Sequence, residues 1–323
     1  MIVTPAVTRG ARARVVVGDG GYDLEQVRLL LDGIPVTVSE GRGPWGGDDV
    51  VALLVGTETE VRAADLDRLP VLRVVATCSV GFDHVEVDEA ARRGVWVCSV
   101  PDYCVDEVAD HALALVLSLL RGVVVLDREV RAGGWNWKAA GELRRIRGTR
   151  LGVVGLGRTG RALVERAAAL GFEVWGADPA LADEEVAATG ARPAPLRELL
   201  ASCHAVSLHV ALTPETEGLL GPEELALMPD GAVLVDTARP QLVDLDALRR
   251  ELESGRLGGA ALDVIPVEPP TSEHPAPTWP RLVVTPHVAW YSAEAEEACH
   301  TRPVLSVRAV LEGREPEGAV NRP

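Results

Sequence analysis

The sequence predicts an α/β protein of two doubly wound parallel-sheet domains with a cleft between them. Its 323 residues are about twice a common domain length, so each half can bury a core of its own. Short β-branched runs alternate with helical stretches through the first hundred residues, and a second alternating series begins at Leu151. This rhythm is typical of βαβ units, whose strands form parallel sheets.

The two series predict the individual elements in order. In the first series, strands are expected over residues 14–17, 50–55, 72–76 and 95–97, and helices over 23–31, 63–69 and 85–93. The second series supplies six strands, in the segments LGVVGLG, FEVWGAD, AVSLHV, AVLVDTA, GAALDV and LVVTPHVA. Six strands with interleaved helices are what a dinucleotide-binding sheet requires. Six prolines within residues 266–280 predict an irregular loop before the last strand.

Two helices are expected to connect the domains. Residues 105–120, VDEVADHALALVLSLL, are too continuously apolar for an exposed helix, and their acidic start suits a helix N-terminus. We expect this helix to cross from the first domain to the second, and a helix over residues 293–311 to return. The predicted domains are therefore residues 1–104 with 291–323, for the substrate, and residues 105–290, for the cofactor.

Composition and charge exclude several classes of partner. The formal net charge of −16 predicts an acidic surface that repels nucleic acid and anionic lipid, and no long basic run offsets it. No apolar stretch reaches the roughly 18 residues of a membrane span, and the segment MIVTPAVTRGARAR lacks the apolar centre of a secretory signal. A cytoplasmic location is expected. The five cysteines are scattered without a CxxC pair, so we expect buried free thiols and no metal site.

The strongest local motif is GLGRTG, which follows an apolar strand and opens a helical run. Gly155 permits a tight turn, Gly157 lets the backbone approach a pyrophosphate, and Gly160 lets the helix pack on the strand. A glycine turn without a ligand is the alternative. Asp178 follows the next strand, 23 residues beyond Gly155, where a carboxylate can bind an adenosine ribose and repel a 2′-phosphate. NAD is therefore predicted over NADP.

Three later residues suit the reduction of a 2-oxo acid by hydride transfer. Arg239 offers a planar guanidinium that can hold a carboxylate and polarise a carbonyl. His287 can donate the proton, since imidazole titrates near neutral pH, and Glu268 can hydrogen-bond its far nitrogen. Each residue alone would be unremarkable, because a single histidine after a strand is more often structural than catalytic.

The ordered series of motifs carries a resemblance to a known family. GLGRTG, Asp178, SLHVALTPET, DTARP, ALDVIPVEP and TPHVAWYS together resemble the D-isomer-specific 2-hydroxyacid dehydrogenases. The segment that runs from VATCSVGFDH to ALALVLSLLR resembles the substrate loop and crossover helix of that family. Within the family, the VPDYCVDEVAD stretch and the tail HVAWYS look closest to the branch of the C-terminal-binding-protein corepressors.

The resemblance implies a flavodoxin-like substrate domain, a Rossmann NAD-binding domain and a homodimer formed through the crossover helix and the GGWNWK loop. It implies that Arg239, Glu268 and His287 are catalytic. Val80 and Gly81 would receive the substrate carboxylate, and Trp290 would lie beside the substrate tail. For Trp290, a position in the core or at an interface is nearly as good an interpretation. The implied cofactor contacts are Val108, Gly155, Gly157, Arg158, Thr159, Gly160, Asp178, Pro179, His209, Val210, Thr213, Thr237, Ala238 and Asp263.

One position departs from the family pattern. Pro240 stands where the family usually has glycine, and it should push Arg239 toward extended backbone geometry. The implied activity is NAD-dependent interconversion of a small 2-oxo acid and its D-2-hydroxy acid. The alternative, which Pro240 supports, is a corepressor-like scaffold that senses NAD(H) with little or no turnover.

Overall fold

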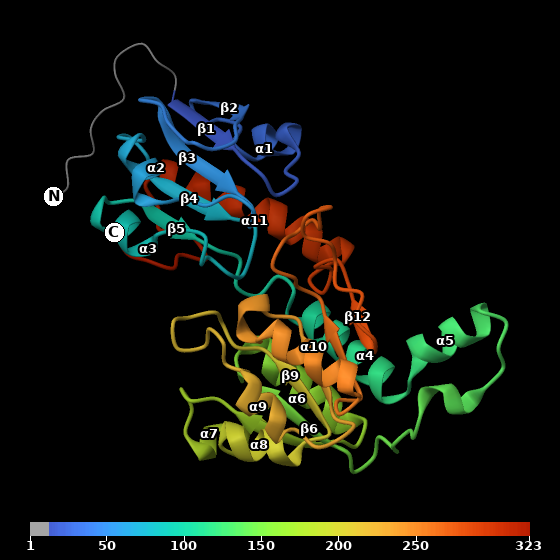
Figure 1. The fold of residues 1–323 in the computed structure, drawn as a ribbon. Helices are drawn as coiled ribbons and strands as arrows, with labels where there is room; N and C mark the ends of the chain where they lie inside the picture. Colours follow the sequence, from blue (N-terminus) through green and yellow to red (C-terminus); the bar gives the residue numbers. More distant parts are fainter. Residues whose placement is uncertain (1–12) are drawn as a thin grey trace. The chain divides into compact units, whose positions relative to one another are not determined.

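The computed structural model describes residues 13–323 and divides into two compact units. Unit 1 runs through Tyr103 and resumes at Ser292–Pro323, and unit 2 is Cys104–Tyr291. These boundaries differ by one residue from the predicted ones. Each unit contains one parallel sheet with helices around it (Figure 1). Most of the segment on which the expectation about a secretory signal rests, residues 1–12, lies outside the described residues.

Unit 1 is a five-stranded sheet in the order β2-β1-β3-β4-β5, which is the flavodoxin-like order. Its strands are β1 (Ala13–Val17), β2 (Val36–Glu40), β3 (Val50–Val55), β4 (Val74–Thr77) and β5 (Trp96–Cys98). Its helices are α1 (Leu24–Leu30), α2 (Ala63–Asp67), α3 (Val87–Arg92) and α11 (Ala293–Leu311). Alternate strand residues face opposite sides, so α1 and α11 cover one face of the sheet and α2 and α3 cover the other.

Unit 2 is a seven-stranded sheet in the order β12-β11-β10-β9-β6-β7-β8. Its strands are β6 (Arg150–Val154), β7 (Glu173–Ala177), β8 (Arg192–Pro193), β9 (Ala205–Leu208), β10 (Val233–Asp236), β11 (Gly259–Leu262) and β12 (Leu282–Val284). Counted from β6, this is the dinucleotide-binding order 3-2-1-4-5-6 with one strand added, and its switch point lies between β6 and β9. The predicted Rossmann fold is confirmed.

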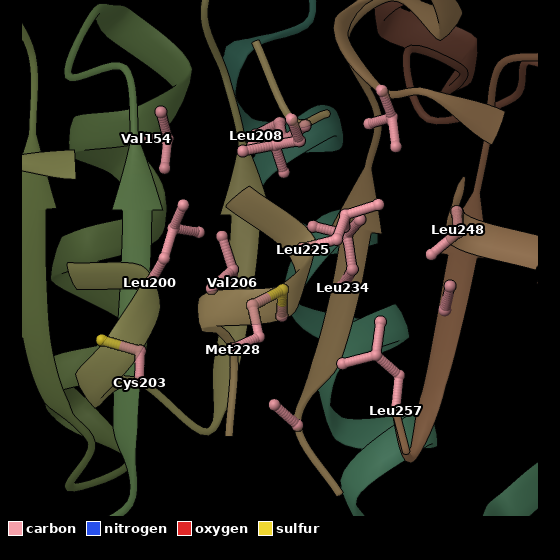
Figure 2. Packing of buried hydrophobic residues seen from close by; sticks show 14 of the residues in the cluster. Val154, Leu200, Cys203, Val206, Leu208, Leu225, Met228, Leu234, Leu248 and Leu257 are labelled. Carbon is pink, nitrogen blue, oxygen red and sulfur yellow. The ribbon is translucent and has the colours of Figure 1, made fainter. Parts of the chain in front are cut away.

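Helices cover both faces of the sheet in unit 2. The helices of unit 2 are α4 (Val105–Leu120), α5 (Val123–Arg131), α6 (Arg158–Ala169), α7 (Asp183–Ala188), α8 (Leu196–Ser202), α9 (Pro222–Leu227) and α10 (Leu245–Ser254), with short 3₁₀ turns η1 (Trp137–Ala140) and η2 (Pro240–Leu242), and all but α5 lie against the sheet. Leu200, Leu225 and Leu248 of α8, α9 and α10 pack on one face against Leu208 and Leu234 of the strands (Figure 2). The predicted connecting helix α4 packs with α6 on the opposite face.

Three elements were not predicted, and each lacks a buried apolar run. The edge strand β2 reads VTVSE and has no fully buried residue. The strand β8 has only two residues. The helix α5 has no buried residue either, and Figure 1 shows it extending away from the rest of unit 2. Because hydrophobic periodicity reports burial, elements that bury little leave a weak signal in the sequence.

The structure places all five cysteine side chains. None of the five cysteines, all of which the structure describes, forms a disulfide bond, and all but Cys78 are buried. Burial raises the pKa of Cys98 and Cys203 to about 12, so these thiols are protonated near neutral pH.

No single helix among residues 13–323 has the length and apolarity to cross a membrane; α4 and α5 meet that test only as a pair bent by 61°.

Candidate functional site

The glycine turn between β6 and α6 leaves an open surface at one of its three glycines. Gly155 has φ +91°, and a Cβ there would lie 2.7 Å from the backbone of His209 and Val210. A Cβ on Gly160 would lie 2.0 Å from the carbonyl oxygen of Gly155, so helix packing requires glycine at that position. A Cβ on Gly157 would meet no atom within 4 Å. Two glycines are thus required by the fold, and the third leaves space beside the helix N-terminus, which fits the predicted dinucleotide.

Asp178 lies at the carboxyl end of β7, beside this turn. Its Oδ2 accepts a hydrogen bond from Leu156 N at 2.8 Å, and its Oδ1 accepts one from Ala180 N at 3.0 Å. The carboxylate therefore orders the glycine turn and remains partly exposed, with lone pairs left for a ribose hydroxyl. Pro179 is exposed next to it.

We expect the protein to bind NADH at least about 10-fold more tightly than NADPH, since the Asp178 carboxylate would repel a 2′-phosphate. In Asp178→Asn the charge is removed while the amide oxygen can still accept from Leu156 N. Isothermal titration calorimetry of both proteins with both cofactors gives the ratio of the Kd for NADPH to the Kd for NADH. This ratio should fall toward unity in the variant. Equal affinity of the wild-type protein for NADH and NADPH would remove Asp178 from its assigned role.

The other predicted cofactor residues gather at the same edge of the unit 2 sheet. His209 and Val210 directly follow β9, Thr237 and Ala238 follow β10, and Asp263 follows β11. Thr213 lies further along the β9 loop, Arg158 and Thr159 open α6, and Val108 lies on the first turn of α4. Carboxyl ends of parallel strands at a switch point are where open α/β sheets bind ligands.

Two side chains at this edge have properties suited to a bound ligand. The Thr237 hydroxyl is buried, with no hydrogen-bond partner among the described residues, and so can pair with a cofactor. His209 Nε2 lies 2.8 Å from Ser207 Oγ, and burial lowers the pKa of His209 to about 4. His209 is therefore neutral near pH 7 and contributes no charge to the site.

His287 and Glu268 form a direct pair. Nδ1 of His287 lies 2.5 Å from Oε2 of Glu268, and the other carboxylate oxygen accepts from Ile265 N at 2.8 Å. Although partial burial raises the pKa of Glu268, the hydrogen bonds from His287 and Ile265 and the charge of Arg239 more than offset it, and the net pKa is lowered. The glutamate is thus ionised and can stabilise a protonated imidazole, whose Nε2 is left for a substrate.

The backbone around His287 is held by Asp263. His287 has φ +51°, a left-handed conformation that is uncommon outside glycine. Asp263 accepts hydrogen bonds from Val288 N at 3.0 Å and Ala289 N at 2.9 Å, and its carbonyl oxygen accepts from His287 N at 2.8 Å. This anchoring role adds to the cofactor contact that the sequence predicts for Asp263.

Two further residues of this network escaped the sequence analysis. The Thr285 hydroxyl donates to Asp263 Oδ1 at 2.5 Å, and His111 Nε2 of α4 lies 3.1 Å from that hydroxyl oxygen. His111 is thereby 3.6 Å from Asp263 Oδ1. The only signal in the sequence was a histidine inside the predicted connecting helix, which says nothing about a partner 174 residues away.

Arg239 has the backbone geometry that Pro240 was expected to impose. Its φ of −147° and ψ of 135° are extended, and Pro240 is the first residue of η2. Proline is tolerated there because the first N–H of a helical turn has no partner within the turn. The guanidinium Nη1 donates to Ala238 O at 2.9 Å, and the positive charge of Arg239 acts on Glu268. The three residues predicted to be catalytic, Arg239, Glu268 and His287, are therefore brought to one edge of unit 2.

A buried carboxyl, Asp236, precedes this set on β10. Its Oδ1 accepts from Ala238 N at 2.8 Å, whereas Oδ2 has no hydrogen-bond partner among the described residues. Burial raises its pKa to about 7, despite the opposing effects of the backbone donors and of Arg239. The proton is held more tightly in the folded state than in the unfolded chain.

Asp236 should make stability depend on pH. Since its folded-state pKa lies above the ordinary value, stability falls as pH rises from about 4 to about 7 and levels off above that. Asn cannot ionise, so the variant does not lose this stability. The free energy of unfolding of Asp236→Asn minus that of the wild type should therefore increase by about 2–3 kcal/mol between about pH 5 and about pH 8. Urea unfolding at the two pH values measures this difference, and a pH-independent difference would contradict it.

The predicted substrate residues fall in both units. Val80 and Gly81 lie in the loop after β4 of unit 1, where the side chain of Val80 is 42% exposed. Trp290 lies at the end of unit 2 and makes an edge-to-face contact with Tyr291, with ring centroids 5.5 Å apart. No group of three metal-ligating side chains occurs in the part of the chain that the structure describes.

Comparison with known proteins identifies the family. Residues 113–289 match the family model described as "D-isomer specific 2-hydroxyacid dehydrogenase, NAD binding domain". A D-3-phosphoglycerate dehydrogenase of Mycobacterium leprae is 39% identical over 84% of this chain and 51% of its own length, so the chain spans about half of that relative. A glycerate dehydrogenase of Methylorubrum extorquens is 33% identical over 87% of this chain and 91% of its own.

A solved structure agrees with these relatives. The D-lactate dehydrogenase of Aquifex aeolicus, crystallised with NAD and lactic acid, superposes with a TM-score of 0.84 at 26% identity, covering 93% of this chain and 96% of its own. The assignment to the corepressor-like branch stays a prediction. Sequence motifs, the two sheet orders and these matches agree, and the chain belongs to the D-isomer-specific 2-hydroxyacid dehydrogenase family.

Proposed function

We propose that the chain reduces a small 2-oxo acid to its D-2-hydroxy acid with NADH, and catalyses the reverse oxidation with NAD. The observation that carries this proposal is the pair of His287 and Glu268, whose atoms Nδ1 and Oε2 are 2.5 Å apart at the ligand-binding edge of unit 2. A histidine fixed by an ionised carboxylate is suited to proton transfer, because the carboxylate stabilises the charged imidazole. Family membership supports the same reaction class.

Each residue has a separate task in the proposed reaction. A bound nicotinamide would supply or accept the hydride at the C2 carbon of the substrate. His287 donates a proton from Nε2 to the carbonyl oxygen, and Glu268 stabilises the imidazolium that gives it. Arg239 binds the substrate carboxylate and draws electron density from the carbonyl.

The test is NADH oxidation, followed by its near-ultraviolet absorbance, with pyruvate, glyoxylate, hydroxypyruvate, phenylpyruvate and 4-methylthio-2-oxobutyrate. Turnover of one of these acids supports the enzyme. Absence of turnover across the panel, with NADH binding demonstrated by calorimetry, would overturn the proposal and favour the NAD(H)-sensing scaffold. Relatives are named for phosphorylated and for unphosphorylated hydroxy acids, so similarity leaves the substrate tail open.

We also propose a homodimer, in which α5 and the following segment lie against a second copy. No residue of α5 is buried, and its Val123 and Val130 are about half exposed. Trp135 is 88% exposed and Trp137 75% exposed, although large apolar side chains rarely cluster on a free surface. Analytical ultracentrifugation of the wild-type protein should give twice the chain mass, and the double variant Trp135→Ser with Trp137→Ser should give a mass nearer that of the monomer.

The expected cytoplasmic location stays a prediction.

A further inference from the structure

A buried carboxylate, Asp263, holds the turn that carries the proposed proton donor. Its two carboxylate oxygens accept hydrogen bonds from Val288 N and Ala289 N, and its carbonyl oxygen accepts one from His287 N. His287 has φ +51°, a conformation that persists in a residue other than glycine only where the surrounding structure enforces it. The position of His287 therefore depends on the orientation of Asp263.

Thr285 makes a further hydrogen bond to this carboxylate. Its hydroxyl donates to Asp263 Oδ1 at 2.5 Å, so the single proton of the hydroxyl is used there. The hydroxyl oxygen can then only accept, and Nε2 of His111 lies 3.1 Å from it. Nε2 of His111 therefore carries a proton, as it does in both the Nε2–H tautomer and the imidazolium. The hydrogen bonds run in one direction, from His111 through Thr285 to Asp263.

The side chain of His111 lies outside the apolar face of α4. That face is formed by the buried residues of the helix, which are Ala109, Ala112, Leu115, Val116 and Leu120. The side chain of His111 is 23% exposed, and its Nε2 lies 3.6 Å from Asp263 Oδ1. Leucine has a similar volume and no donor, so the hydrogen bond to Thr285 can be removed with little loss of packing.

We propose that His111 and Thr285 are positioning residues for the reaction. Together they fix the Asp263 carboxylate, and through it the turn that directs Nε2 of His287 toward the substrate. This inference rests on the proposed function and adds two residues to it. The four residues come from α4 and from the segments after β11 and β12, all within unit 2. Hydrogen bonds between three separate elements restrict the turn, and a displacement of about 1 Å near a reacting group can cost about 10²-fold in rate.

The first test removes the donor on α4. His111→Leu should lower kcat about 10-fold at saturating NADH, because the turn that carries His287 is held less firmly. The KM for the 2-oxo acid should change by less than about 3-fold, since Arg239 binds the carboxylate. His111→Gln offers an amide N–H on a side chain of similar reach and should keep kcat within about 3-fold of wild type. Steady-state kinetics with the preferred 2-oxo acid measure both constants.

The matched control is His204→Leu, the same substitution on another half-buried histidine of unit 2. His204 lies directly before β9, at the opposite end of that strand from the site, and its Nδ1 accepts from Arg150 N at 3.3 Å. The control also loses one hydrogen bond and should keep kcat within about 2-fold of wild type. Wild-type kcat in His111→Leu would overturn the inference, and so would an equal loss in His111→Gln or in His204→Leu. If the wild-type protein turns over no 2-oxo acid, the proposed function fails and the inference fails with it.

A cycle of single and double variants tests whether the two residues act in series. Thr285→Val removes the hydroxyl and should lower kcat about 10-fold, whereas Thr285→Ser keeps the hydroxyl and should stay within about 3-fold of wild type. If the hydrogen bonds act as one chain, adding His111→Leu to Thr285→Val causes little further loss, and the double variant stays about 10-fold below wild type. Independent losses would multiply to about 100-fold, and that result would overturn the inference.

Discussion

Replacing His287 by alanine should reduce kcat for the reduction by at least about 10²-fold, the usual contribution of a positioned general acid, while the Kd for NADH changes by less than about 2-fold. The reason is the geometry of the pair. Oε2 of Glu268 pairs with Nδ1 of His287, and Oε1 accepts a hydrogen bond from Ile265 N, so the imidazole is held in one orientation with Nε2 available to a substrate. Steady-state kinetics with the preferred 2-oxo acid and calorimetric NADH titration measure the two quantities.

A backbone effect must be separated from the loss of the imidazole. His287 has φ +51°, and alanine is disfavoured in that region, so His287→Ala can also disturb the loop. Asparagine tolerates the left-handed conformation, which makes His287→Asn the matched variant. Both variants should lose activity to a similar extent. Retention of wild-type kcat in His287→Asn would show that the loop conformation matters and that imidazole does not transfer the proton.

The sequence predicted best those features that depend on local chemistry. The GLGRTG turn, Asp178 at a strand end and the extended backbone of Arg239 before Pro240 follow from steric rules that act over a few residues. Six strands of unit 2 were found because each is an apolar run, and five of them, all but the edge strand β12, are buried on both faces. The polar edge strand β2 and the exposed helix α5 were missed for the opposite reason.

Long-range hydrogen bonds lay beyond the sequence. The anchoring of the His287 loop by Asp263, and the contact from His111 through Thr285, join residues of α4, of the segment after β11 and of the segment after β12. Neither residue type nor spacing predicts such a network, because a histidine in a helix or a threonine after a strand occurs in many unrelated structural settings. The carboxylate oxygen of Asp236 that has no hydrogen-bond partner in residues 13–323 is likewise a property of the packed sheet and not of the motif VDTARP.

Substituting Gly157 by alanine should weaken NADH binding by about 10- to 100-fold, with little effect on the stability of the protein. In the protein without cofactor the added methyl group meets no atom within 4 Å, and the φ of −68° at Gly157 is open to any residue. If a pyrophosphate lies on this surface, the methyl group occupies the space of its closest approach, and such overpacking typically costs about 1–3 kcal/mol. Calorimetric titration with NADH measures the loss.

Thermal unfolding should distinguish two glycine variants of this turn. Gly157→Ala should lower the free energy of unfolding by no more than about 1 kcal/mol. Gly157 is the N-cap residue of α6, and the one cost expected of the substitution is that alanine is less favourable than glycine at an N-cap. Gly160→Ala should unfold at a much lower temperature, since its Cβ would lie 2.0 Å from the carbonyl oxygen of Gly155. A stable Gly157→Ala protein with wild-type NADH affinity would mean that the glycine turn serves the fold alone and that the cofactor phosphates bind elsewhere.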